Sequence, residues 1–118
     1  MAPPGTYFVT FSTWERTRLF VVEAYAKVFL QTLYGYRRQG SFQLHAFVLM
    51  PEHIHLLLTP ANEVTLERVV QLIKGGYSHK FGSEFGRKKE VWQEGLRIIE
   101  FETPGIMKFI ANTFIKIR

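Results

Sequence analysis

Short apolar runs of β-branched and aromatic residues alternate along the chain with longer segments whose apolar positions recur at helical spacing. Thr6–Ser12 consists largely of such residues and predicts a strand. Residues 42–50 and 53–59 are two further apolar runs separated by a Pro-Glu dipeptide, so they predict an antiparallel hairpin with Pro51 in its turn. Leu96–Phe101 predicts a fourth strand.

Three segments show the period of amphipathic helices. The first covers about Val22–Arg38, the second begins near Leu66 after a capping Thr65, and the third begins at Thr103-Pro104. Residues 82–91 predict a basic loop. The three apolar stripes are Val22, Ala26, Phe29, Leu30 and Leu33; Leu66, Val69, Val70, Ile73, Tyr77 and Phe81; and Ile106, Phe109, Ile110, Thr113, Phe114 and Ile117.

Two adjacent glycines, Gly75 and Gly76, lie in the middle of the second predicted helix. Each glycine destabilises a helix interior by about 1 kcal/mol relative to alanine. Close approach of another backbone or of a ligand would explain the pair, and so would a kink in the helix. The sequence leaves both explanations open.

The predicted order of elements, β-α-β-β-α-β-α, indicates an α+β protein. Without its last helix this order is the split βαβ arrangement of the ferredoxin-like fold, an antiparallel sheet with helices on one face. The chain of 118 residues has the length of one compact domain and contains no internal repeat. We therefore expect a single domain over residues 1–118, with an additional C-terminal helix.

Two histidines open the second strand of the predicted hairpin. Because side chains alternate across a strand, His53 and His55 point to one face while Ile54 and Leu56 point to the other. Two imidazoles at positions i and i+2 of a strand are close enough to share a divalent metal ion. A solvated or hydrogen-bonded histidine pair is the alternative that the sequence leaves open.

Composition limits the class of protein and its partners. A net charge of +5 and a pI near 9.7 favour polyanionic partners. The absence of cysteine excludes disulfides and thiolate metal sites. The N-terminus lacks the regions of a signal peptide, and no apolar run has the length of a membrane span. We expect a soluble cytoplasmic protein with no membrane partner.

Several cations and an aromatic residue lie in the second half of the chain, where they could contact nucleic acid. Arg87, Lys88 and Lys89 precede Trp92 closely, and Lys74 lies on the preceding predicted helix. Cations of this kind bind phosphates while an aromatic ring stacks on a base. A solvated basic loop, with Trp92 as a core anchor, is the alternative.

Four segments together resemble the single-tyrosine HUH transposases of insertion sequences and their REP-associated relatives. The segments are Thr6–Ser12, His45–Leu57 with its Met-Pro-Glu-His-Ile-His core, Leu72–Tyr77 and Val91–Gly95. The resemblance implies that His53, His55 and a third polar ligand hold Mg²⁺ or Mn²⁺ at a phosphate of single-stranded or hairpin DNA. It also implies attack by a tyrosine of the C-terminal helix, which leaves a 5′-phosphotyrosine and a free 3′-hydroxyl. A homodimer and association with the prokaryotic nucleoid are further expectations from the family.

The nucleophile of this family has no match here. All five tyrosines precede the last predicted helix, and the family's tyrosine falls near Thr113 or Phe114. The family's third metal ligand would fall at Arg118, a poor ligand, where the given chain ends. The explanations open at this point are an engineered or truncated chain, a decayed copy with a shifted frame, or Tyr77 as a substitute nucleophile. A core role for Tyr77 is favoured over the last, because Tyr77 falls on an apolar stripe.

Three functional hypotheses follow. The first is a transposase-type DNA-binding protein of the HUH class, impaired in cleavage unless a tyrosine is restored near position 114. The second is a non-catalytic, metal-independent nucleic-acid-binding module with a ferredoxin-like sheet. The third is a small metallohydrolase that uses the histidine pair with Glu52 and forms no protein–DNA adduct.

Overall fold

The computed structural model describes residues 5–86 and 90–101. Two short 3₁₀ turns, Trp14–Arg16 and Leu19–Val21, join the first strand to the first helix. The main elements are β1 (Thr6–Ser12), α1 (Glu23–Arg38), β2 (Phe42–Leu49), β3 (His53–Pro60), α2 (Leu66–Phe85) and β4 (Arg97–Phe101). The predicted order β-α-β-β-α-β is confirmed over this part of the chain.

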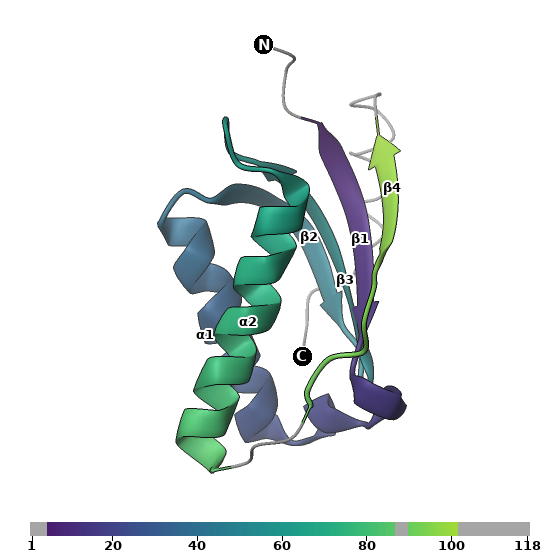
Figure 1. The fold of residues 1–118 in the computed structure, drawn as a ribbon, viewed down its shortest axis with the longest axis vertical. Coiled ribbons are helices and arrows are strands. Elements are labelled where there is room, and N and C mark those ends of the chain that lie inside the picture. Colours follow the sequence, from purple (N-terminus) through teal and green to yellow (C-terminus); the bar gives the residue numbers. More distant parts are fainter. Residues whose placement is uncertain (1–4, 87–89, 102–118) are drawn as a thin grey trace.

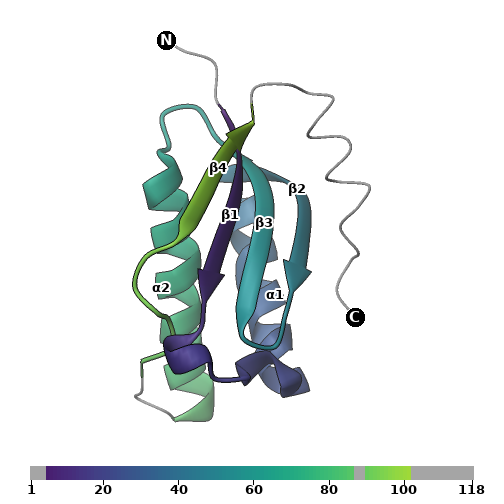
Figure 2. The ribbon, with the colours of Figure 1, turned by 90° about the vertical axis from the view of Figure 1, so that its right-hand side faces the viewer.

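The four strands form one antiparallel sheet in the order β2-β3-β1-β4. Both helices cover the same face of this sheet, side by side (Figure 1). In Figure 2 the sheet faces the viewer and the helices lie behind it. The predicted α+β class, with a helix-covered antiparallel sheet, is confirmed.

The core fills the space between the sheet and the two helices. Val9, Ile54 and Leu56 from the sheet are completely buried, as are Phe29 of α1 and Ile73 of α2. Burying side chains of this size contributes about 1.5–3 kcal/mol each, so packing on this face of the sheet stabilises the fold substantially. The opposite face of the sheet carries the polar residues that concern the site.

The second helix begins as predicted and ends later than predicted. The Thr65 side chain accepts a hydrogen bond of 3.0 Å from the backbone N–H of Arg68. The helix then continues through Phe85, so the predicted loop over 82–91 is wrong for its first four residues. Packing accounts for the extension, because the Phe85 ring lies 4.6 Å from that of Tyr25. Gly86, at φ 66°, provides the left-handed C-terminal cap.

The glycine pair in α2 has two different environments. A Cβ on Gly76 would lie 2.5 Å from the Tyr36 hydroxyl oxygen of α1, whereas a Cβ on Gly75 would meet nothing within 4 Å. The close approach that the sequence suggested therefore exists at Gly76. In the structure it is made by a side chain of the neighbouring helix rather than by its backbone.

Some sequence-based predictions lie outside the described residues. They concern the C-terminal helix from Thr103, with Phe114 and Arg118, and the cations Arg87, Lys88 and Lys89 of the basic loop. Within the described ranges, neither helix combines the length and apolar character needed to cross a lipid bilayer.

Candidate functional site

The face of the sheet that turns away from the helices carries both histidines. In the β1–β3 register His55 lies opposite Thr10 and His53 lies opposite Ser12. Their neighbour Ile54 is completely buried on the helix side. The prediction that His53 and His55 share a face is confirmed, while metal binding by the pair stays a prediction.

The two imidazole rings are adjacent and each is held by a hydrogen bond at Nδ1. The ring centroids lie 4.7 Å apart and the ring planes are nearly perpendicular, at 88°. Nδ1 of His53 donates to Oε1 of Glu52 at 2.8 Å, and Nδ1 of His55 lies 2.9 Å from the Thr10 hydroxyl. Contacts of this kind orient metal-ligating histidines and favour coordination through Nε2. The hypothesis of a hydrolase with Glu52 as its base loses support, because this carboxylate is engaged by a histidine.

The electrostatic setting favours a neutral His55. Burial lowers the pKa of His55 below its usual value, and the neighbouring His53 lowers it further. A neutral imidazole is the form that binds a metal ion. The neutral form of His55, which is the metal-binding form, is therefore favoured at neutral pH.

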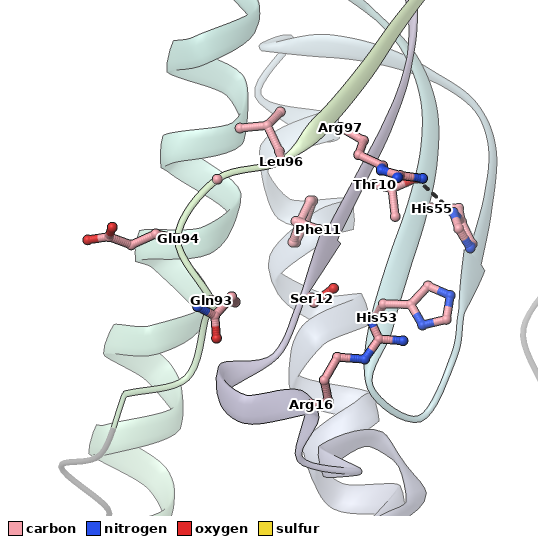
Figure 3. A pocket seen from close by; sticks show the side chains of 11 residues that line it. Thr10, Phe11, Ser12, Arg16, His53, His55, Gln93, Glu94, Leu96 and Arg97 are labelled. Carbon is pink, nitrogen blue, oxygen red and sulfur yellow. Dashed lines mark hydrogen bonds between the residues drawn. The ribbon is translucent and has the colours of Figure 1, made fainter.

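A cavity of about 550 Å³ opens in front of the histidines (Figure 3). Its walls come from β1, from the turn after β1, from the start of β3 and from residues 93–97. Ser12, Gln93 and Arg97 are among the polar residues that line it. The cavity is open to solvent and large enough for a phosphate with its flanking sugar.

Trp92 and Lys74 fix the wall formed by residues 93–97. The indole Nε1 of Trp92 donates to the Lys74 carbonyl oxygen at 2.9 Å, and the Lys74 ammonium donates to the Gln93 carbonyl oxygen at 3.1 Å. The backbone N–H of Gln93 donates to the Ser12 carbonyl at 3.0 Å. These bonds join α2 to the cavity wall and to the end of β1.

The predicted DNA-contacting residues therefore separate into distinct groups. Trp92 is only 8% exposed and its ring packs 5.0 Å from that of Phe11, which is the core-anchor alternative. Burial lowers the pKa of Lys74, and Glu94 partly offsets this effect. The ammonium of Lys74 also lies over the Phe11 ring, 5.6 Å from its centroid, so Lys74 contacts other residues of this protein in the structure. DNA contact by Lys74 stays a prediction, as it does for the three cations that the structure does not describe.

Arg16 and Arg97 line the cavity beside the histidines and were missed by sequence reasoning. Arg97 could have been found from the register, because it lies opposite Thr10 and thus on the histidine face. Arg16 has no such signal. It follows Glu15 in a turn where both residues adopt left-handed backbone angles, at φ 56° and 51°. Neither is glycine or asparagine, and this conformation costs about 1–2 kcal/mol per residue.

The described residues supply part of a metal site. Each histidine has a hydrogen bond at Nδ1, the kind of support that metal-ligating histidines have. Within residues 5–86 and 90–101, however, no group of three histidine, aspartate or glutamate side chains converges. The chemistry of the described donor set thus fits two of the ligands of a metal ion.

Tyr77 lies on the other side of the sheet from the histidines. It is completely buried and its hydroxyl donates to the Tyr25 carbonyl oxygen at 3.0 Å. Its ring packs 5.5 Å from that of Phe29 and 5.6 Å from that of Trp92. Burial also raises the pKa of Tyr77, which disfavours the nucleophilic phenolate. Tyr77 packs as a core residue, which favours the core role over that of a substitute nucleophile.

Comparisons with known proteins agree with this arrangement. Residues 5–110 match the family described as "Transposase IS200 like". The fold is similar to that of a REP-associated tyrosine transposase bound to a REP hairpin, with 20% sequence identity and a TM-score of 0.71 over 92% of this chain. The match covers 62% of that protein, so this chain spans less than two thirds of its length.

A second solved structure matches over nearly its whole length. It is a candidate transposase from Deinococcus radiodurans R1, with 19% identity and a TM-score of 0.71. The match covers 97% of this chain and 94% of that protein. Among curated proteins, none matches the chain.

Proposed function

The chain belongs to the IS200-like transposase family, and we propose that it binds single-stranded DNA that carries a hairpin. The observation that carries the proposal is the pair of supported imidazoles, His53 and His55, in an open cavity on the face of the sheet that turns away from α1 and α2. A similar fold has been seen bound to a REP hairpin. The positive net charge of this chain suits the same class of partner.

Mg²⁺ or Mn²⁺ is the proposed cofactor, with His53 and His55 as its protein ligands. Imidazole suits transition metals better than Mg²⁺, which favours Mn²⁺ here. When bound, such an ion would polarise a phosphate oxygen of the DNA. Glu52 and Thr10 would keep the two rings oriented, and the wall of residues 93–97 would confine the strand at this position.

Strand cleavage needs a nucleophile that the described residues do not supply. In the proposed reaction a tyrosine oxygen bonds to phosphorus while the bond from phosphorus to the 3′-oxygen breaks, and that oxygen leaves as a hydroxyl. The position expected for this tyrosine is occupied by Phe114, whose ring has no nucleophilic atom. We therefore expect DNA binding without cleavage.

A homodimer stays a prediction from the family.

Binding to labelled DNA, measured by fluorescence anisotropy, tests the proposal. The probes are a hairpin with a single-stranded flank, the flank alone and a blunt duplex. We expect the hairpin probe to bind most tightly and Mn²⁺ to strengthen that binding. The double change His53→Ala and His55→Ala should abolish the Mn²⁺-dependent gain, which we expect to be about tenfold. Titration calorimetry with MnCl₂ gives an independent readout of metal binding.

His79→Ala, on the exposed surface of α2, is the matched control and should leave both readouts unchanged. Equal affinity for all three probes would contradict the proposed DNA specificity. Hairpin binding that neither Mn²⁺ nor the double change affects would support the second candidate, a metal-independent DNA-binding module. That candidate has one observation in its favour, since only two metal ligands converge within the described residues.

A further inference from the structure

The turn after β1 holds its backbone in an unfavourable conformation at the rim of the cavity. Glu15 and Arg16 are consecutive residues with left-handed φ angles of 51° and 56°. A strained backbone persists only where surrounding contacts enforce it, and such strain is frequent at functional sites. The turn therefore raises the question of what its conformation achieves.

Contacts on both sides enforce the conformation. Thr13 is 1% exposed, and its hydroxyl lies 2.7 Å from the Thr17 carbonyl oxygen and 3.1 Å from that of Glu52. The Glu15 backbone N–H donates to Oε1 of Gln93 at 3.3 Å. The turn is thus tied to the loop before His53 and to the opposite wall of the cavity.

The result of this conformation is the direction of one side chain. Arg16 extends from the turn toward His53, and Arg97 extends from β4 toward Thr10 and His55 (Figure 3). The two guanidinium groups therefore approach the histidine pair from different elements, the turn after β1 and the strand β4. Glu94, the acidic residue in the lining, points away from them (Figure 3).

Neither arginine is neutralised by the part of the chain that the structure describes. The ion pairs among the described residues are those of Glu23 with Lys27 and of Glu52 with His53. Arg16 and Arg97 are both exposed and make no ion pair with a described residue. A planar guanidinium binds phosphate through paired N–H donors, which makes arginine the preferred residue for this anion.

We infer that Arg16 and Arg97 hold one phosphate of the bound DNA strand over the histidine pair, and that the strained turn serves to aim Arg16. The inference rests on the proposed function and assigns the residues that would position the strand. Neither arginine supplies or removes a proton. They are positioning residues, and their contribution is to fix one phosphate where His53 and His55 can act on it.

Arg16→Gly separates function from stability at this position. Glycine adopts positive φ without strain, so the melting temperature should stay the same or rise. Affinity for the hairpin probe should fall about five- to tenfold, and the slope of log affinity against log salt should shrink by about 0.7, the value for one single-strand phosphate. Glu15→Gly is the matched control, because it relieves the same strain and keeps the guanidinium. Its affinity should not fall.

A neutral methylphosphonate, placed at one linkage of the probe at a time, locates the phosphate. One position should weaken binding by the unmodified chain, and the same position should have a smaller effect on Arg16→Gly or Arg97→Ala, each of which retains one of the two guanidinium groups. Arg68→Ala, on the helix side of the molecule, should retain the full effect of the methylphosphonate. If the methylphosphonate and the arginine substitutions weakened binding independently, so that their effects added at every linkage, the inference would be overturned.

The two proposals can fail separately. Tight hairpin binding by the unmodified chain, together with unchanged affinity and salt slope in Arg16→Gly and Arg97→Ala, would overturn the phosphate clamp and leave the proposed function in place. Absence of hairpin binding by the unmodified chain would overturn the proposed function.

Discussion

Tyr77 is completely buried and its hydroxyl donates a hydrogen bond to the Tyr25 carbonyl oxygen. Tyr77→Phe keeps the ring and removes this bond, so we expect the free energy of unfolding to fall by about 1 kcal/mol. Hairpin binding should not change, because the residue lies across the sheet from the histidines. Urea unfolding and anisotropy measure the two effects, and Tyr34→Phe is a control on the adjacent helix.

Tyr77→Phe, compared with Phe114→Tyr, tests which residue can form a covalent bond with DNA. With a single-stranded substrate analysed on denaturing gels, a protein–DNA adduct should form only after Phe114→Tyr, and Tyr77→Phe should not reduce it. An adduct formed by the unmodified chain and lost in Tyr77→Phe would show that the core assignment is wrong.

Residues also differ in how well their place in the site can be predicted from the sequence. The histidine pair could be predicted because strand alternation depends only on sequence spacing. Arg16 could not, because nothing in a Glu-Arg dipeptide signals a left-handed turn that only tertiary contacts enforce. His45 lies at an irregularity in the register between β2 and β3, where it contacts Thr59 at 2.8 Å. Irregularities of this kind place an extra residue in one strand and increase the local twist, and a simple alternation of polar and apolar residues does not predict them.

At the scale of elements, the two glycines of α2 provide a matched pair. Gly75→Ala should stabilise the protein by about 0.5–1 kcal/mol, because alanine favours the helix and its Cβ meets nothing within 4 Å. Gly76→Ala should destabilise it, because the new Cβ would lie 2.5 Å from the Tyr36 hydroxyl oxygen. Thermal unfolding monitored by circular dichroism measures both.

The double change Gly76→Ala with Tyr36→Leu tests the cause of that destabilisation. Removal of the phenol should recover much of the loss if the contact between α1 and α2 is responsible. A loss of stability in Gly75→Ala would instead indicate that the glycine pair permits a kink in the helix, which was the other explanation that the sequence left open.

The elements also show where sequence reasoning was sufficient. β1, the hairpin and the start of α2 follow from apolar periodicity, turn residues and a threonine cap, all of which are local signals. The end of α2 does not, because Gly82 and Ser83 are typical of loops and the helix is extended by contacts of Phe85 with α1. A local pattern could not reveal a contact with a residue 60 positions earlier, Tyr25.

For the molecule as a whole, the partly buried histidines His45 and His55 connect stability to pH. Burial lowers the pKa of both His45 and His55 in the folded state. The unfolded chain, whose histidines keep a pKa of about 6.5, therefore binds more protons as the pH falls below that value. The stabilisation is present above about pH 6.5 and is lost as the solution becomes more acidic. The free energy of unfolding should thus decrease from about pH 7.5 to about pH 5.5.

Urea unfolding across this range measures the decrease, at a pH where most carboxylates are still ionised. The double change His45→Gln and His55→Gln should flatten the dependence, whereas His79→Gln, on the exposed surface of α2, should not. If the free energy of unfolding of the double variant still changed with pH as steeply as before, other groups would account for the proton uptake.

The same protons compete with a cation for His55, so Mn²⁺ should stabilise the protein more at about pH 7.5 than at about pH 5.5.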